Sequence, residues 1–229
     1  MTIKAVVFDL DGTITEFNLD YKAVRREVCR ILAEAGVPKS ELSMDESTFA
    51  LIRRARLILR RNGRTEEGAS RTVEKALLTI EEREIQAAKT TYLLPGVRMT
   101  LQKLKDYGIS RGLCTVNGEA STKIVLSRFR IADCFNAVVP RDQTLNIKPN
   151  KQHLEKVLNL LKVQGKETAV VGDGVSDMKC AKAVQAVAIG LPTGVSTRAE
   201  LENGGAEYIL AKMSELSELV SRINSVTKS

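Results

Sequence analysis

Residues 3–13 read Ile-Lys-Ala-Val-Val-Phe-Asp-Leu-Asp-Gly-Thr, an apolar run that ends in two carboxylates and a glycine. Residues 3–9 are rich in β-branched side chains, which is typical of a strand buried on both faces of a parallel sheet. Asp9 and Asp11 then lie where that strand ends, and Gly12 permits the chain to reverse. Because ligands bind outside this edge of an open parallel sheet, the stretch predicts a fold class and a site.

Further apolar runs alternate with helical patterns along the chain. The runs are residues 112–115, 137–140, 168–173, 186–189 and 207–210. The helical patterns cover approximately 97–107, 119–128, 151–161, 176–184 and 213–224. Strand followed by helix, repeated, predicts an α/β domain whose parallel sheet is doubly wound, as in Rossmann-like folds.

Residues 15–92 interrupt this alternation. They contain helical periodicity at 19–35, 47–61 and 70–91 and no convincing strand. Leu94-Pro95-Gly96 marks the end of the interruption, because proline and glycine stop one element before the next begins. The sequence therefore predicts an α/β core of residues 1–14 and 93–229, with an all-helical domain of residues 15–92 inserted into it.

A second acidic group follows another predicted strand, in Gly172-Asp173-Gly174-Val175-Ser176-Asp177. Taken alone, Asp173 and Asp177 are as well explained as caps of the next helix. However, two strands of one sheet would bring these acids to the same edge as Asp9 and Asp11, which is electrostatically costly without a cation. A hard divalent cation that prefers oxygen ligands, such as Mg2+, would neutralise them.

Two other strand ends carry groups suited to an anion. Thr115 offers a hydroxyl, and the backbone amides next to it precede a predicted helix, whose N-terminus favours negative charge. Lys148 stands before Pro149 and a further helix, where its ammonium would be held in place. Each residue alone is commonplace, since a lone lysine is usually solvated.

Together, these groups resemble the four ordered motifs of the haloacid dehalogenase superfamily. The motifs are Asp9-x-Asp11-Gly-Thr, Thr115, Lys148-Pro149 and Gly172-Asp173-Gly-x-x-Asp177. The insertion is similar to the superfamily's cap domain in position and helical character. The stretches Leu94-Pro95-Gly96-Val97 and Gly190-Leu191-Pro192-Thr193-Gly194 look most like the phosphoglycolate-phosphatase-like branch.

The resemblance implies a Mg2+-dependent phosphatase that hydrolyses a small phosphate monoester, phosphoglycolate or similar, through an aspartyl-phosphate intermediate. Asp9 would be the nucleophile, and Asp11 would protonate the leaving oxygen and then activate water. Substrate phosphate would be bound by four residues: Thr115, Val116, Asn117 and Lys148. Mg2+ would be held by four acidic residues: Asp9, Asp11, Asp173 and Asp177. Val116 separates Thr115 from Asn117, whereas in that family asparagine often follows the threonine directly.

Composition excludes several other classes of protein. No stretch of roughly 18 apolar residues is present to span a bilayer, so a membrane protein is not expected. The N-terminus lacks the pattern of a secretory leader, and we therefore expect a cytoplasmic protein. Four widely separated cysteines predict free thiols rather than disulfides or a zinc site. The single histidine, His153, stands in the first turn of a predicted helix, and we expect it to be exposed.

The net charge of +7 and a cluster of arginines leave alternatives open. The cluster consists of Arg53, Arg54, Arg56, Arg60, Arg61 and Arg64. It is either a solvated basic helix face or the source of one or two arginines for a substrate anion. A nucleic-acid-binding module is disfavoured, because residues 50–91 contain no aromatic residue for base stacking. A sugar phosphomutase of the same superfamily stays possible, and the sequence does not distinguish a monomer from a homodimer.

Overall fold

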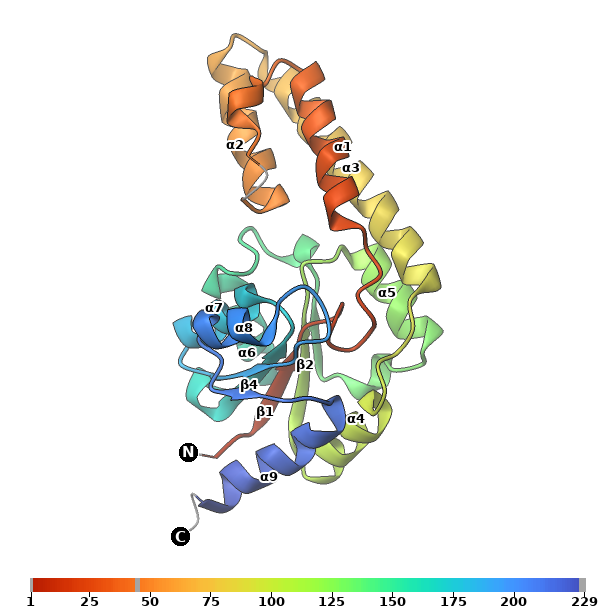
Figure 1. The fold of residues 1–229 in the computed structure, drawn as a ribbon, viewed down its shortest axis with the longest axis vertical. Coiled ribbons are helices and arrows are strands. Elements are labelled where there is room, and N and C mark those ends of the chain that lie inside the picture. The colour runs from red at the N-terminus through yellow and green to blue at the C-terminus, as the bar shows by residue number, and fades with distance from the viewer. Residues whose placement is uncertain (1, 44–45, 227–229) are drawn as a thin grey trace. The chain divides into compact units, whose positions relative to one another are not determined.

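The computed structural model describes residues 2–43 and 46–226 and divides into two compact units (Figure 1). The first unit comprises Met1–Asn18 and Ala88–Ser229. The second comprises Leu19–Ala87. The first unit is therefore made of two chain segments, and the second unit is inserted between them.

The described part of the first unit contains a six-stranded parallel sheet. Its strands are β1 (Ala5–Phe8), β2 (Ser110–Cys114), β3 (Ala137–Val139), β4 (Thr168–Gly172), β5 (Val187–Gly190) and β6 (Tyr208–Ile209). The order across the sheet is β3-β2-β1-β4-β5-β6, so that β1 pairs with β2 on one side and with β4 on the other. This order confirms the predicted Rossmann-like topology.

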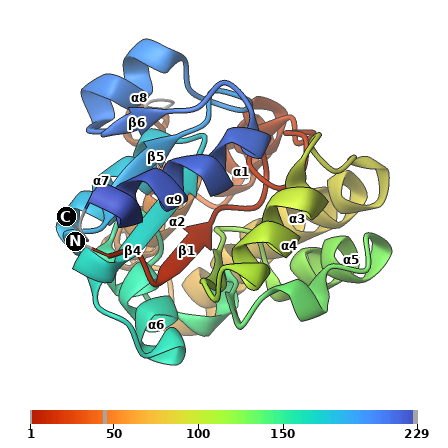
Figure 2. The same cartoon turned by 90° about the horizontal axis from the view of Figure 1, so that it is seen from below.

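Helices cover both faces of the sheet, because successive side chains of a strand point to opposite faces (Figure 2). Val6 and Phe8 of β1 pack in one apolar cluster, whereas Val7 packs in the other. The first cluster receives α4 (Val97–Asp106), α5 (Glu119–Arg128) and α9 (Leu216–Val226). The second receives α6 (Lys151–Leu161), α7 (Val175–Ala183) and α8 (Arg198–Gly204). The sheet is therefore doubly wound.

Two helices of this unit differ from the sequence prediction. Helix α8 was not predicted, because it has only seven residues and buries Leu201 alone. The helix expected at 213–224 begins as a 3-10 turn at Met213–Glu215 and becomes α-helical at Leu216. Both differences lie away from the predicted site residues in sequence.

The second unit is built from helices. They are α1 (Tyr21–Glu34), α2 (Thr48–Arg61) and most of α3 (Glu66–Thr90). Asp20 caps α1 by accepting from the Ala23 amide at 2.9 Å, and Ser47 caps α2 by accepting from the Ala50 amide at 3.1 Å. An apolar core of its own joins the three helices, with Leu32, Leu51 and Leu59 fully buried.

Most members of the arginine cluster bond within this second unit. Arg54 pairs with Glu41 and Glu46. Arg60 lies 3.0 Å from Glu66, which also pairs with Arg56. Arg64 donates to the Ala35 carbonyl at 2.9 Å. For Arg54, Arg56 and Arg60 the contacts favour the interpretation as a basic helix face tied into its own unit, and Arg64, which follows α2, is tied into the same unit.

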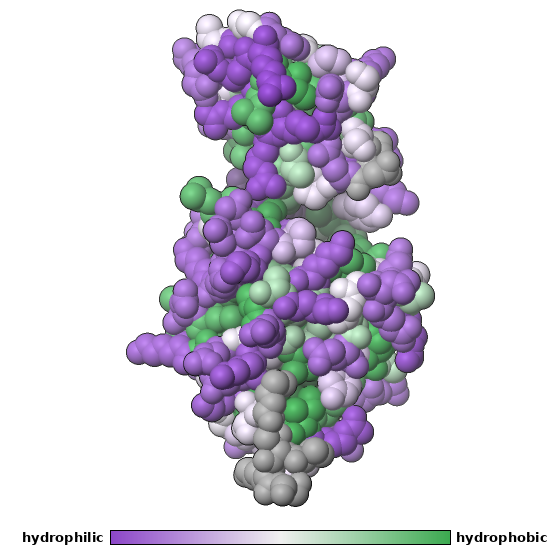
Figure 3. Space-filling model, turned by 90° about the vertical axis from the view of Figure 1, so that its left-hand side faces the viewer, coloured by the Kyte–Doolittle hydropathy of each residue, from purple (hydrophilic) through white to green (hydrophobic). Residues whose placement is uncertain are grey.

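In the part of the chain that the structure describes, none of the helices is both long enough and apolar enough to cross a bilayer. On the face drawn in Figure 3, hydrophilic residues predominate and apolar residues lie scattered between them.

Candidate active site

The candidate site lies at the point where β1 and β4 end. Chain connections leave this point in opposite directions, towards β2 on one side and β5 on the other, which is where α/β sheets bind ligands. Asp9 follows β1, and its amide donates to the Val171 carbonyl of β4 at 2.9 Å. Asp173 directly follows β4. The register of the two strands thus brings together acids that are far apart in the sequence.

Three carboxylates gather here. One oxygen from each of Asp9, Asp173 and Asp177 can be chosen so that all three lie within 4.8 Å of one another. Burial, together with the charges of Asp9 and Asp177, raises the pKa of Asp173 to about 8. Burial also raises the pKa of Asp177 to about 6, although the Lys148 ammonium opposes that rise. The buried carboxylates therefore repel one another when they are ionised, and a bound cation would offset that repulsion.

Lys148 is the buried cation of the site. Its Nζ lies 2.6 Å from Asp9 Oδ1 and 2.6 Å from Asp177 Oδ1, and only 7% of the residue is exposed. Burial by itself lowers the pKa of Lys148, but Asp177 and Asp9 outweigh it and hold that pKa well above its usual range. The side chain is therefore a fixed ammonium between two carboxylates.

Backbone and hydroxyl groups hold Asp173 in place. The Val195 amide donates to its Oδ2 at 2.8 Å, and the Thr13 hydroxyl lies 3.4 Å from its Oδ1. A Cβ atom at Gly12 would lie 2.5 Å from this carboxylate, and one at Gly194 would lie 2.0 Å from it. Both positions therefore require glycine. The predicted site residues did not include these groups that hold Asp173. The turn Gly190-Leu191-Pro192-Thr193-Gly194, which follows the apolar run 186–189, was a usable signal.

Asp11 is held by two side chains. Its Oδ1 accepts from the Thr15 hydroxyl at 3.0 Å, and its Oδ2 accepts from Asn117 Nδ2 at 2.8 Å. Thr15 was not among the predicted site residues. Asn117 was predicted as a substrate contact, and in this structure its side-chain amide donates to Asp11, another residue of the site.

Thr115 and Val116 follow β2 at the same sheet edge. The Thr115 hydroxyl accepts from the Asn117 amide at 3.1 Å, and the Thr115 amide donates to the Val139 carbonyl at 3.2 Å. The Val116 carbonyl accepts from Arg141 Nη1 at 2.6 Å. Contacts within the chain thus link every predicted phosphate-binding residue to its neighbours at this edge.

The prediction that His153 is exposed is wrong, because the residue is completely buried. Its Nδ1 accepts from the Lys148 amide at 3.3 Å, and its Nε2 lies 3.2 Å from the Val139 carbonyl oxygen. Burial, assisted by the Lys148 ammonium, lowers the pKa of His153 to about 4. The residue shares the buried face of α6 with Leu154 and Val157, a pattern that the sequence already contained.

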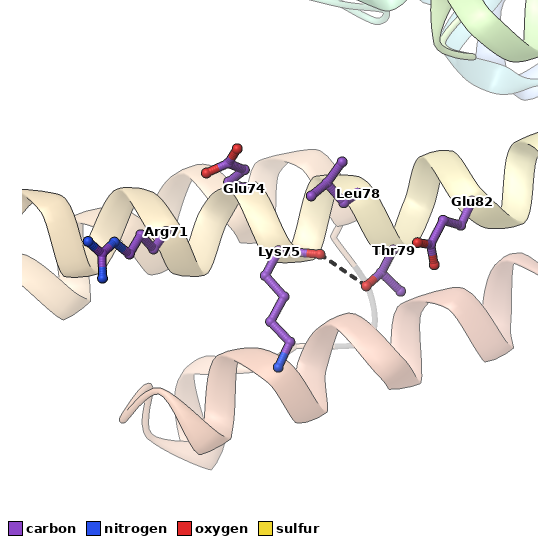
Figure 4. Close-up of a pocket in the computed structure, with 6 residues that line it drawn as sticks. All are labelled: Arg71, Glu74, Lys75, Leu78, Thr79 and Glu82. Atoms are coloured by element: carbon purple, nitrogen blue, oxygen red, sulfur yellow. Dashed lines mark hydrogen bonds between the residues drawn. The ribbon is translucent and has the colours of Figure 1, made fainter.

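Outside the candidate site, a pocket lies on the surface of α3, within the second unit (Figure 4). Its lining residues are Arg71, Glu74, Lys75, Leu78, Thr79 and Glu82. The Thr79 hydroxyl donates to the Lys75 carbonyl at 3.0 Å, and Leu78 is half exposed. Mixed charges around one apolar side chain provide no nucleophile with an adjacent base, so this pocket is not a catalytic candidate.

Comparison with known proteins agrees with this geometry. A family model described as a haloacid dehalogenase-like hydrolase matches residues 3–185. Pyrophosphatase PpaX of Bacillus mycoides is 31% identical over 125 residues, which cover 55% of this chain and 58% of that protein. The match therefore spans little more than half of that relative. A phosphoglycolate phosphatase of Yersinia pseudotuberculosis is 27% identical over 231 residues, covering 93% of this chain and 91% of that protein.

A solved structure shows the same fold. The putative phosphoglycolate phosphatase from Lactobacillus plantarum has a TM-score of 0.70 to this chain at 21% identity. The superposition covers 96% of this chain and 100% of the other. The similarity therefore extends over both units of the fold.

Proposed function

We propose that this chain, which belongs to the haloacid dehalogenase-like hydrolase family, is a phosphatase that hydrolyses a small phosphate monoester with Mg2+, through an aspartyl phosphate on Asp9. The observation that carries the proposal is the cluster of Asp9, Asp173 and Asp177, with the Lys148 ammonium paired to Asp9 and Asp177. It combines a carboxylate nucleophile, oxygen ligands for a cation and a positive charge for phosphate at one sheet edge.

The acidic cluster fits Mg2+ in donor type and in number. Mg2+ prefers oxygen ligands and is usually bound by one or two carboxylates together with substrate phosphate and water. Carboxylate oxygens of Asp9, Asp173 and Asp177 lie close enough to share one ion, and the Asp11 carbonyl would complete the protein ligands. Such a cation offsets the repulsion between an anionic nucleophile and an anionic substrate.

Asp9 would attack phosphorus in line with the leaving oxygen. Its bond to phosphorus forms as the ester P–O bond breaks, and Asp11 donates a proton to the departing oxygen. In the second step Asp11 takes a proton from a water molecule as that water attacks phosphorus. Inorganic phosphate then leaves and Asp9 is restored. Thr15 and Asn117 would hold the Asp11 carboxyl group through both steps.

Thr115 and Lys148 would bind the phosphate oxygens that take no part in bond breaking. The Thr115 oxygen already accepts from the Asn117 amide, so its own proton can be donated to phosphate. Lys148 has three N–H donors, of which Asp9 and Asp177 accept two. The loss of one such contact costs about 2.7–4 kcal/mol of transition-state stabilisation.

The test is release of inorganic phosphate from a panel that includes phosphoglycolate, pyrophosphate, sugar phosphates and nucleoside monophosphates. Each compound is assayed with Mg2+ and with EDTA, for the wild-type chain, for Asp9→Asn and for Asp133→Asn. Asp133 is an exposed carboxylate of the same unit and is the matched control. We expect turnover that requires Mg2+, that Asp9→Asn abolishes and that Asp133→Asn leaves unchanged.

Other outcomes would identify the alternatives. Isomerisation of a sugar phosphate primed with its bisphosphate, without net phosphate release, would replace hydrolysis by a mutase activity. Pyrophosphate as the best substrate would move the substrate class away from monoesters. Salt-dependent duplex binding without any turnover would favour a nucleic-acid-binding module.

A further inference from the structure

His153 is a buried polar residue that the proposed mechanism leaves unused. It is the single histidine of the chain, and its side chain is completely buried. Buried polar groups are retained where their hydrogen bonds are satisfied, and both ring nitrogens of His153 lie within hydrogen-bond distance of backbone groups. Its partners therefore indicate what the residue does.

The ring joins the backbone at Lys148 to the end of β3. Since the Lys148 amide is a donor, Nδ1 must accept and can carry no proton. The single proton of the neutral ring then sits on Nε2 and is donated to the Val139 carbonyl. The contacts thus select one tautomer.

The same carbonyl also serves Thr115. Val139 O accepts from the Thr115 amide at 3.2 Å in addition to its contact with His153 at 3.2 Å. A continuous path of three hydrogen bonds therefore runs from the Lys148 amide through the imidazole and the Val139 carbonyl to the Thr115 amide. Its two ends are the backbone groups of the two residues whose side chains would hold the phosphate.

We propose that His153 is a positioning residue that fixes Lys148 and Thr115 relative to each other, as the neutral tautomer protonated on Nε2. The inference rests on the proposed function, because it assigns phosphate binding to these two residues. His153 itself contacts neither substrate nor reacting atoms. The depressed pKa of His153 is consistent with a ring that stays neutral at neutral pH.

The tautomer is tested without any activity measurement. The protein labelled with 15N-histidine gives a single ring spin system, because the chain has one histidine. We expect shifts of a deprotonated Nδ1 and a protonated Nε2 at neutral pH. A ring protonated on Nδ1, or on both nitrogens, would overturn the inference even if the enzyme is active.

The positioning role is tested with three substitutions at this site. His153→Phe fills the space and removes both hydrogen bonds, whereas His153→Asn can still accept from the Lys148 amide and His153→Gln can still donate to Val139. We expect kcat of the Phe variant to fall about 100-fold with a much smaller change in KM, since a misplacement of ~1 Å has about this effect on rate. The Asn and Gln variants should recover part of the loss.

Thr100→Val is the matched control for buried hydrogen bonding. The Thr100 hydroxyl is buried in the same unit and donates to the Met213 carbonyl at 3.1 Å, away from the sheet edge. Its loss should lower the melting temperature and leave kcat of the folded enzyme within about twofold of wild type. An active wild type with an equally active His153→Phe variant refutes the inference, whereas an inactive wild type refutes the proposed function.

Discussion

The contact between Asn117 and Asp11 shows how a shift of one position changes what a side chain can do. With Val116 between Thr115 and Asn117, the asparagine amide lies 2.8 Å from Asp11 Oδ2. Its nearest role in the proposed reaction is therefore to orient the general acid. The sequence shows only that Val116 separates Asn117 from Thr115, and the fold identifies Asp11 as the hydrogen-bond partner of Asn117.

A leaving-group comparison tests that role. Asn117→Ala should lower kcat/KM for alkyl phosphates by tenfold or more, since general acid catalysis contributes about 10²–10⁴-fold. The effect on p-nitrophenyl phosphate should be much smaller, because its leaving group departs without a proton. Steady-state kinetics on both ester types provide the measurement. Asn136→Ala, which removes an acceptor of the Arg111 amide, is the control, and equal losses on both esters would contradict the role.

The cysteines make a second prediction at this scale. Burial raises the pKa of the Cys114 thiol far above its usual value and that of Cys180 to about 11. Both residues are free and buried, whereas Cys29 and Cys134 are half-buried. Because the thiolate is the reactive form, iodoacetamide should label Cys114 and Cys180 only after unfolding. The measurement is peptide mass spectrometry after labelling of the native protein. Labelling of Cys114 or Cys180 before unfolding would contradict the prediction.

His153 marks the limit of residue-by-residue interpretation. The residue was placed in the first turn of a helix correctly, since α6 begins at Lys151 and Asn150 caps it. The expectation of exposure rests on its place in that first turn and leaves out which side of the helix faces the sheet. Helical spacing puts His153 and Val157 on one face, so the apolar stripe of the helix already indicated that His153 is buried.

At the scale of elements, continuous apolar runs were sufficient for the sheet. Parallel strands such as β1 and β4 are buried on both faces, so their sequences are continuously apolar rather than alternating between apolar and polar residues. Short helices without several buried residues carry no such signal, and α8 was missed for that reason. In the site, the sequence indicates which residues follow the strands, whereas the contacts that Thr13, Thr15 and the Val195 amide make with Asp173 and Asp11 depend on folded geometry.

The turn after β1 makes a prediction at this scale. Gly12 has a φ of +78° and an added Cβ there would meet the Asp173 carboxylate, whereas Gly108 has a φ of +70° and an added Cβ there would meet open space. Gly108→Ala should cost about 1–2 kcal/mol of unfolding free energy from the left-handed backbone alone. Gly12→Ala should cost more and should also displace Asp173, so that Mg2+ no longer raises the melting temperature. A Mg2+ response equal to that of Gly108→Ala would contradict this expectation.

At the scale of the whole molecule, the acidic cluster couples stability to pH. The pKa of Asp173 rises to about 8 and that of Asp177 to about 6, against 3.8 for the unfolded chain. Between about pH 4 and pH 8 these two carboxyl groups therefore bind more protons in the folded protein than in the unfolded chain. Without a cation, these groups make the free energy of unfolding fall as pH rises through this window.

Denaturant titrations at several pH values test that coupling. In EDTA, Asp173→Asn should flatten the decline, and Asp133→Asn should leave it unchanged. Because Mg2+ binds the ionised carboxylates, it should stabilise the protein more at pH 8 than at pH 5. A decline that is equally steep in Asp173→Asn would show that other groups cause it.

The position of β1 has a consequence for biosynthesis. Its Phe8 pairs with Val171, so one edge of this central strand stays without its partner until β4 is made much later by the ribosome. At about 5–20 residues per second, the delay is of the order of ten to thirty seconds. Leu19–Ala87 leaves the ribosome complete within that interval and has its own core. The nascent chain thus carries an apolar β segment with one unpaired edge, followed by a unit with its own core, which makes Ala5–Phe8 a natural binding segment for chaperones during translation.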